Sequence, residues 1–319
     1  MTDPREISRP AGISVVVPVY NSATTLSRLV NRLEPVLVST GAPFELILVD
    51  DGSHDDSWNV IQDLAASRPW ISGMTMMRNF GQHNALLAGV RIARFELTVT
   101  MDDDLQHPPE ELPKLLAEIE KGFDVVYAPP LKEQHGIARN LASRITKLVL
   151  QSSIGAETAC KLSAWRAFRT DLRIAFASFH SPFVCMDVLL TWATKKFGFV
   201  KLRHEPRFEG KSKYTIRKLI RHALNMMTGF SVLPLQVASF IGFAFTLVGF
   251  ALLLFVFIRY LITGSVVAGF HFLASIISIF SGAQLFTLGV IGEYIACMHV
   301  RTMDKPCYCI RGEVNVTRN

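Results

Sequence analysis

The sequence has neither of the glycine-rich loops with which many α/β proteins hold phosphate groups. No G-x-G-x-x-G and no G-x-x-x-x-G-K-[ST] occurs among its 319 residues. Those motifs place backbone N–H groups around a dinucleotide or a nucleoside triphosphate. Their absence excludes a dinucleotide-binding Rossmann domain and a P-loop NTPase, so the charge of a phosphate ligand has to be met by other groups.

Cysteine is scarce and irregularly spaced. The five cysteines form no C-x₂-C pair, and the two in "CYC" are too close together for a zinc knuckle. We therefore expect no zinc site, no disulfide framework and a reducing compartment. Finger spacings and basic–aromatic patterns are missing as well. The net charge of +6 thus favours an anionic membrane as a partner, and no nucleic acid is expected.

Two long C-terminal segments have few or no ionisable residues. Residues 235–258 carry no charge, and residues 270–292 carry only His271 near their start. Each segment is long enough to cross a hydrocarbon core about 30 Å thick. The connector is short and contains one basic residue, Arg259. The sequence therefore predicts two transmembrane helices in a hairpin, with both outer ends on the same side.

The N-terminal part alternates between apolar runs and segments with helical periodicity. Strands are predicted at residues 13–20, 44–50, 71–77, 96–102 and 124–128, with a helix in each interval. The strands are continuously apolar rather than alternating, which is typical of a parallel sheet covered by helices on both faces. The sequence thus predicts an α/β domain with a mostly parallel sheet.

Polar clusters follow three of these strands. Tyr20 and Asn21 end the first strand, "DDGSHDD" at 50–56 follows the second, and "DDDLQ" at 102–106 follows the fourth. The carboxyl ends of parallel strands meet at one edge of a sheet, where ligands bind in open α/β folds. We expect these clusters to form one site.

The acidic cluster after the fourth strand predicts a metal site. Asp102 and Asp104 stand two apart on an extended segment, so both can address one cation, with Gln106 next in the series. Oxygen ligands of this kind suit Mg²⁺ or Mn²⁺, which can bridge to a diphosphate. The alternative is a solvated loop with acids at a helix start, and it accounts for Glu110 and Glu111.

Four motifs in this order resemble the family-two glycosyltransferases of the GT-A fold. They are "VVVPVYN", "LVDDGSHDDS", "RNFGQHNALLAG" and "DDDLQHPPEE". More narrowly, the chain is similar to the polyprenyl-phosphate glycosyltransferases, the dolichyl-phosphate-mannose-synthase-like group with a C-terminal membrane hairpin. The resemblance spans nearly the whole chain. It implies a Rossmann-like GT-A catalytic domain that transfers a sugar from a nucleotide diphosphate to a lipid phosphate, with inversion.

The resemblance also implies roles for individual residues. The first two motifs hold the nucleotide in that family, and the D-x-D-L-Q segment holds the metal and the diphosphate. The nucleotide role carries over to Pro18, Tyr20, Asp50 and Asp51, with Asp103 beside them in the variable middle position. The metal role carries over to Asp102, Asp104 and Gln106.

Cations and neighbouring polar groups for the phosphates are implied further along the chain. The family's Arg-x-x-x-Ser element matches Arg139 and Ser143, and its R-x-x-G-x-S-K-Y element matches Arg207, Ser212 and Lys213. Three positions depart from the family pattern. Pro130 stands where an arginine is usual, with Lys132 as the nearest substitute. Glu157 and Ser163 stand where the family has an aspartate and an arginine. These departures leave the sugar undetermined.

Charge around the hydrophobic segments indicates their orientation. Basic residues are concentrated on the outer flanks, at 211–221 and 301–305. The positive-inside rule then places the catalytic domain on the cytoplasmic side of the plasma membrane. Residues 213–232 have an apolar stripe with basic residues elsewhere, which predicts an interfacial helix, the alternative being a helix packed on the catalytic domain. The predicted parts are 1–212, 213–232, 233–300 and 301–319, the last a cytoplasmic tail.

The sequence thus predicts a metal-dependent, inverting enzyme that transfers a sugar, with a UDP-sugar the favoured donor, to undecaprenyl or a similar polyprenyl phosphate. The resemblance also implies a homo-oligomer joined through membrane helices. Two alternatives remain. One is a catalytically weak nucleotide-sugar-binding or scaffold protein, which the retained Asp102 and Asp104 disfavour. The other is a processive polysaccharide synthase, whose Q-x-x-R-W motif is missing.

Overall fold

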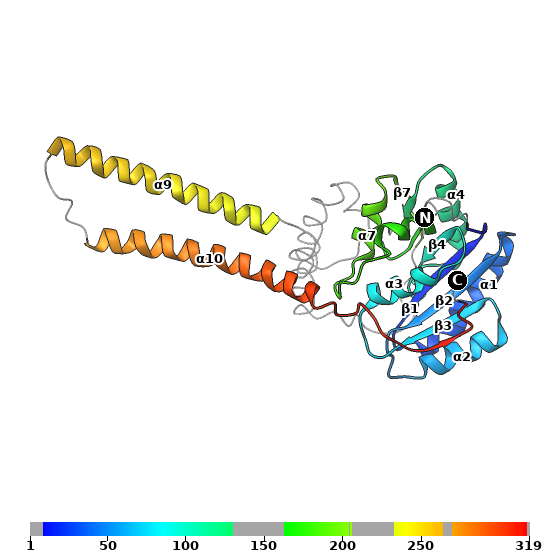
Figure 1. Cartoon of the computed structure of the whole chain (residues 1–319). Coiled ribbons are helices and arrows are strands. Elements are labelled where there is room, and N and C mark those ends of the chain that lie inside the picture. Colours follow the sequence, from blue (N-terminus) through cyan, green and yellow to red (C-terminus); the bar gives the residue numbers. More distant parts are fainter. Residues whose placement is uncertain (1–8, 130–162, 204, 206–232, 264–269, 318–319) are drawn as a thin grey trace, which may run out of the picture. The chain divides into compact units, whose positions relative to one another are not determined.

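The computed structural model describes residues 9–129, 163–203, 205, 233–263 and 270–317. Its centre is an eight-stranded sheet with the order β7-β5-β6-β4-β1-β2-β3-β8 (Figure 1). The strands are β1 (Ile13–Val19), β2 (Phe44–Asp50), β3 (Ile71–Met76), β4 (Leu97–Thr100), β5 (Val125–Tyr127), β6 (Arg166–Arg169), β7 (Phe197–Phe199) and β8 (Ile310–Val314).

Helices follow the strands much as the apolar periodicity predicts. They are α1 (Ala23–Ser39), α2 (Ser57–Ser67), α3 (Gln82–Ile92), the short η1 (Pro109–Glu111), α4 (Leu112–Glu120), η2 (Thr170–Phe176) and α7 (Met186–Ala193). Pro108 precedes η1, and Pro109 and Pro113 occupy first-turn positions, where a missing backbone N–H costs little.

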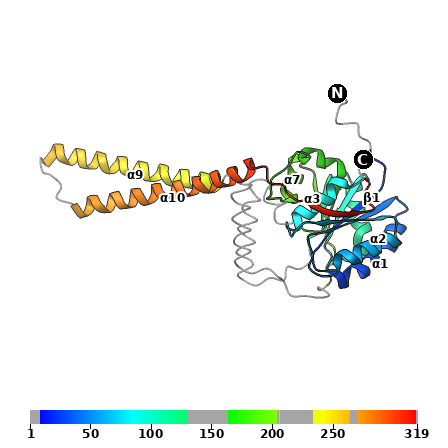
Figure 2. The same ribbon diagram turned by 60° about the horizontal axis from the view of Figure 1, so that its bottom comes forward.

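Two apolar cores cover the two faces of the sheet. Val15, Val17 and Val19 of β1 pack with α1, α2 and α4 on one face, whereas Val16 packs with α3 and α7 on the other. Figure 2 shows α1 and α2 on the opposite side of the sheet from α3 and α7. The alternation along β1 follows from the two-residue period of a strand, and burial on both faces explains its continuous apolar sequence.

The central strands are parallel, and the prediction of a mostly parallel α/β sheet is confirmed. β1 pairs in parallel with both β2 and β4, and β2 pairs in parallel with β3. β6 lies antiparallel between β4 and β5, while β7 pairs in parallel with β5. The sheet is therefore mixed, and its carboxyl edge is formed by β1, β2 and β4.

The edge next to β3 is formed by a segment from the far end of the chain. β8 pairs antiparallel with β3, with Gly73 opposite Val314. The sequence predicts a tail over 301–319, and here the structure differs. The alternating pattern of "IRGEV" suits an edge strand with one covered face, and Asn315 donates two side-chain hydrogen bonds to the carbonyls of Ala65 and Ile71.

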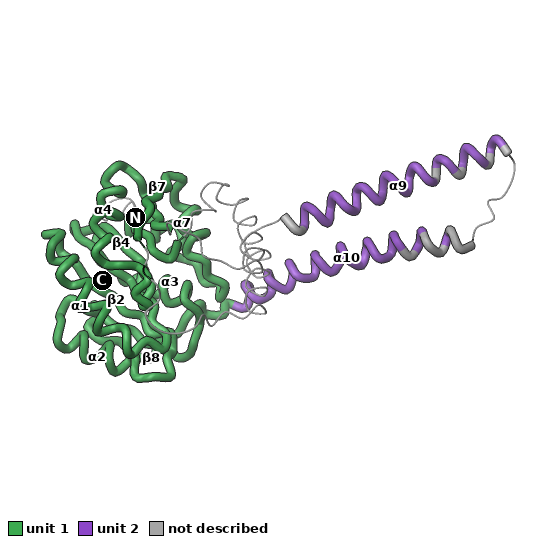
Figure 3. The backbone as a smooth tube through the Cα atoms, turned by 180° about the vertical axis from the view of Figure 1, so that it is seen from behind, with its two compact units in different colours: residues 1–216, 304–319 green, residues 217–303 purple. Residues whose placement is uncertain are grey.

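The chain forms two compact units, one of residues 1–216 with 304–319 and one of residues 217–303 (Figure 3). Within the second unit, α9 (Leu233–Thr263) and α10 (Phe270–Thr302) are long and apolar enough to span a membrane. They pack on each other, and the rings of Phe245 and Phe280 meet edge to face at 5.8 Å. The expected interfacial helix at 213–232 lies outside the described residues.

Candidate active site

The loops after β1 and β2 are joined by hydrogen bonds. Asn21, in the left-handed region at a φ of 53°, donates its N–H to the Ser53 hydroxyl and accepts one from the N–H of His54. Asp50, at the end of β2, is buried and accepts hydrogen bonds from the Thr75 hydroxyl and the Ser53 N–H. These contacts bring the predicted nucleotide residues Tyr20 and Asp50 to one edge of the sheet. Pro18 lies within β1, opposite Val49.

Asp51 connects the loop after β2 to the loop after β3. Its two carboxylate oxygens accept the N–H groups of Phe80 and Gly81 at 2.7 and 2.9 Å. Burial raises the pKa of Asp51 to about 6, and the charge of Asp50 contributes in the same direction, while the two backbone hydrogen bonds oppose the shift. Asp51 therefore holds the backbone of Phe80 and Gly81, directly before the first residue of α3.

The raised pKa of Asp51 predicts a pH-dependent stability. Between about pH 4 and pH 6 the unfolded chain releases this proton first, so stability should fall with rising pH by about 2–3 kcal/mol and then level off. Asp51→Asn should remove this part of the slope in thermal unfolding of the detergent-solubilised chain. Asp63→Asn, on the exposed side of α2, is the control. An unchanged slope in the Asp51 variant would contradict the assignment.

The acidic loop after β4 is held by neutral donors. Asp102 Oδ1 accepts the Gln82 side-chain amide at 2.6 Å, and Asp104 Oδ1 accepts the N–H of Gln106 at 3.1 Å. Leu105, between Asp104 and Gln106, is buried with a φ of 60°, which is uncommon for a residue with a side chain of this size. Such backbone strain persists only where the surroundings enforce it, and it is concentrated at functional sites.

The middle aspartate has a different environment. Asp103 Oδ2 accepts the backbone N–H of Tyr20 at 3.3 Å, so it links the end of β4 to the end of β1. Burial raises the pKa of Asp103, with the charge of Asp104 adding to it, while hydrogen bonds from Ser22 and Tyr20 act in the opposite direction. The three adjacent carboxylates thus separate into one that joins two loops and two that flank it.

The donor set suits a divalent cation. Asp102, Asp104 and Gln106 offer oxygen atoms, the ligands that Mg²⁺ and Mn²⁺ prefer. The Gln82 amide and the Gln106 N–H, both neutral donors, orient the two carboxylates. These residues fit the expected metal, and the loop can therefore place a cation beside the nucleotide residues.

Glu205 ties a later segment to this loop. Its N–H donates to the carbonyl of Gln106 at 3.0 Å, and its carboxylate pairs with Arg32 of α1. Arg32 also forms two hydrogen bonds with Glu110, at 2.9 and 2.7 Å. Glu110 thus has a second role besides starting a helix. The predicted Arg207 comes two positions after Glu205 in the sequence.

Many of the predicted phosphate-binding residues cannot be placed. Those that lie outside the described residues are Pro130, Lys132, Arg139, Ser143, Glu157, Arg207, Ser212 and Lys213. Ser163 is described, and its hydroxyl accepts the N–H of Trp165. The roles expected of the undescribed residues stay predictions.

A charged cluster next to β4 was not predicted from the sequence. Arg166 of β6 is 2 % exposed, forms an ion pair with Asp187 of α7, and donates from Nε to the Thr100 hydroxyl. The Tyr127 hydroxyl donates to the same oxygen of Asp187. The one available signal was an arginine inside the short apolar run "AWRAF".

The chain is similar to a protein family, to two named transferases and to one solved structure. A family model described as "Glycosyl transferase family 2" matches residues 14–174. An undecaprenyl-phosphate 4-deoxy-4-formamido-L-arabinose transferase of Shewanella sediminis is 33 % identical and covers 94 % of this chain and 91 % of its own. The protein of that name from Pseudomonas aeruginosa (strain LESB58) is also 33 % identical, with 96 % and 91 % covered. A crystal structure of a mycobacterial protein shares the fold, at a TM-score of 0.51 and 19 % identity over 69 % of this chain and 73 % of its own.

Proposed function

The chain belongs to glycosyl transferase family 2, and on that premise we propose that it transfers a sugar from a nucleotide diphosphate sugar to polyprenyl phosphate. The observation that carries the proposal is the meeting of three loops at the carboxyl edge of β1, β2 and β4. Asp103, after β4, accepts the N–H of Tyr20, after β1, and Asn21, after β1, donates its N–H to the Ser53 hydroxyl, after β2. Nucleotide and diphosphate would bind along this edge.

The reaction demands little proton transfer. A lipid phosphate is already ionised at neutral pH, so its oxygen can attack the anomeric carbon directly, with inversion. The protein's task is to align the two substrates and to stabilise the departing nucleotide diphosphate. Asp102, Asp104 and Gln106 would hold Mg²⁺ or Mn²⁺, which supplies positive charge to the diphosphate when bound. Arg139, Arg207 and Lys213 are proposed to meet the remaining phosphate charge.

The acceptor class follows from two independent features. The similar proteins of Shewanella sediminis and Pseudomonas aeruginosa are named for undecaprenyl phosphate, and α9 and α10 are long and apolar enough to span a membrane. We place both helices across the plasma membrane, with the catalytic unit on the cytoplasmic side where the basic flanks favour it. Self-association through these helices is part of the same proposal.

The test is transfer of radiolabelled sugar from a panel of nucleotide sugars to undecaprenyl phosphate, using the full chain in detergent. The panel includes UDP-linked hexoses and the UDP-linked 4-deoxy-4-formamido-L-arabinose. We expect lipid-linked product with Mn²⁺ or Mg²⁺ and loss of product with EDTA, restored by excess metal. Nucleotide binding with no transfer from any donor would favour the scaffold alternative. Product that grows by repeated addition would favour a processive synthase.

A further inference from the structure

A buried ion pair lies directly beside the strand that ends in the proposed metal loop. Arg166 is the register partner of Thr100 in the antiparallel β4–β6 pair, and Asp102 follows two residues after Thr100. The Arg166 guanidinium reaches both the Thr100 hydroxyl, at 3.1 Å from Nε, and Asp187 Oδ1. An arginine held in this way keeps its charge, because its guanidinium does not deprotonate in proteins.

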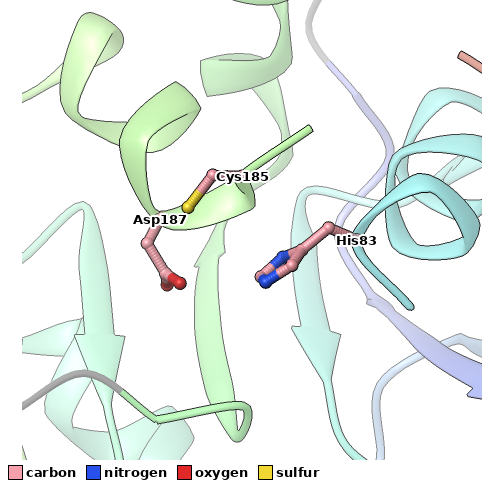
Figure 4. Close-up of side chains that lie close together, drawn as sticks. All are labelled: His83, Cys185 and Asp187. Atoms are coloured by element: carbon pink, nitrogen blue, oxygen red, sulfur yellow. The ribbon is translucent and has the colours of Figure 1, made fainter. Parts of the chain in front are cut away.

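The same cluster contains a set of side chains that could suggest a second metal site. His83, Cys185 and Asp187 bring their potential ligand atoms within 4.8 Å of one another, and Figure 4 shows the imidazole pointing toward the other two. Two of the three are poor ligands here. Burial raises the pKa of the Cys185 thiol to about 12, and His83 Nδ1 accepts the N–H of Met186 at 3.4 Å. The nearby guanidinium opposes a further cation as well.

Asp187 is better explained as the counter-ion of Arg166. Both hydrogen bonds to its carboxylate, from Arg166 and from the Tyr127 hydroxyl, end on Oδ1. Burial lowers the pKa of Arg166, but the negative charge of Asp187 acts in the opposite direction and the pKa is raised on balance, with Asp102 also contributing to the rise. Asp102 is thus within electrostatic reach of the guanidinium.

Asp102 is also connected to the cluster through the first residues of α3. Gln82, which holds Asp102 Oδ1, is the residue before His83 at the start of α3, and His83 accepts the Met186 N–H at the start of α7. Asp102 therefore accepts a neutral amide that orients it, and the buried cation that could pair with it instead stands opposite Thr100, two residues earlier in the chain. Capture would remove a carboxylate from the metal.

We propose that Asp187 is a positioning residue whose negative charge holds Arg166 away from Asp102, so that Asp102 stays available to the divalent cation. This inference rests on the proposed function, because it takes Asp102 as a metal ligand. It assigns Asp187 no contact with either substrate. The buried Arg166 and the partly buried Asp187 form a pair that is neutral as a whole.

The test is a double-mutant cycle read out as Mn²⁺ affinity, titrated with UDP present on the full chain in detergent. Asp187→Asn should weaken Mn²⁺ binding about tenfold, because one uncompensated positive charge then acts on the site. Arg166→Met should tighten binding severalfold, because the repelling charge is gone and Asp187 remains. The double variant should return to within about twofold of the wild type. A purely structural role would weaken binding in both single variants.

Control variants distinguish a general effect of charge, a folding defect and a wrongly assigned metal site. Arg169, at the end of β6, and Glu96, just before β4, form a partly exposed ion pair, and Arg169→Met with Glu96→Gln should leave Mn²⁺ affinity unchanged in every combination. If Asp187→Asn does not fold, Arg166→Met decides alone, and unchanged or weaker binding in it overturns the proposal. If Asp104→Ala keeps wild-type Mn²⁺ binding, the metal site itself is wrong, whatever the Arg166 cycle gives.

Discussion

Asp104→Ala should lower sugar transfer by about a hundredfold to a thousandfold and abolish metal-dependent nucleotide binding. A rate loss of this size is typical when one group that stabilises the charge developing in the transition state is removed. The protein should still fold, because Asp104 is half-buried and its local hydrogen bond to the Gln106 N–H is worth about 1 kcal/mol. The measurements are product formation, Mn²⁺ titration and thermal unfolding of the same preparation.

The matched control for Asp104→Ala is Asp63→Ala, which removes an exposed carboxylate from α2. It should leave transfer, Mn²⁺ binding and the unfolding temperature within error of the wild type. The control separates loss of a specific ligand from loss of one negative charge. Near-normal transfer by the Asp104 variant would remove the metal loop from the mechanism.

Gly52→Ala should strongly destabilise the catalytic unit, although it adds only one methyl group. Gly52 has a φ of +67°, and a Cβ there would lie 2.5 Å from the carbonyl carbon of Arg78 and 2.8 Å from the backbone nitrogen of Asn79. A flexible side chain could move away, but backbone cannot do so without shifting the 78–81 loop. That loop donates the N–H groups that hold Asp51. We expect a loss of about 3 kcal/mol in stability and loss of nucleotide binding.

Gly41→Ala is an unusually close control for Gly52→Ala. Gly41 has a φ of +68°, but a Cβ there would meet no atom within 4 Å. The variant should lose about 1 kcal/mol of its free energy of unfolding, because a residue with a Cβ is disfavoured at this φ, and it should bind nucleotide normally. Thermal unfolding and UDP titration of both variants separate crowding from backbone strain. Equal losses in the two variants would contradict the role given to the 78–81 loop.

Much of the catalytic unit could be predicted from the sequence because its central strands are apolar on both faces. Such runs mark β1, β2, β3 and β4 directly, and parallel pairing then places the polar residues after them at one edge. The hydrogen bond between Tyr20 and Asp103 shows that the loops after β1 and β4 meet at this edge, as the sequence predicts. For this part of the chain, local pattern and overall topology agree.

β6 and its buried arginine could not be found in the same way. "RAFR" is only four residues long and begins and ends with a charge, which is more typical of a loop. Its burial depends on Asp187, 21 positions further on, and on insertion between β4 and β5. A charge that becomes acceptable only through a distant partner has no signature in the surrounding sequence.

The same reason applies to Glu110. Its place in the first turn of a helix suffices to explain an acid at that position, so the sequence pattern predicts no further partner for it. Its partner Arg32 is 78 positions earlier, in α1, and the same guanidinium holds Glu205. Only the folded chain shows that three distant segments share one cation.

The pairing of β8 with β3 also sets the order of events during synthesis. The Ser72 hydroxyl donates to the carbonyl of Asn315, 243 positions later, so the two segments leave the ribosome far apart in time. At a synthesis rate of about 5–20 residues per second, β3 is made roughly 10–50 seconds before β8, and its outer edge is unpaired during that time. Both long apolar helices emerge during that interval. An uncovered strand edge invites pairing with other chains. The nascent catalytic unit must therefore be shielded until the helices have been made, and a chain terminated after α10 would keep that edge open to aggregation and proteolysis.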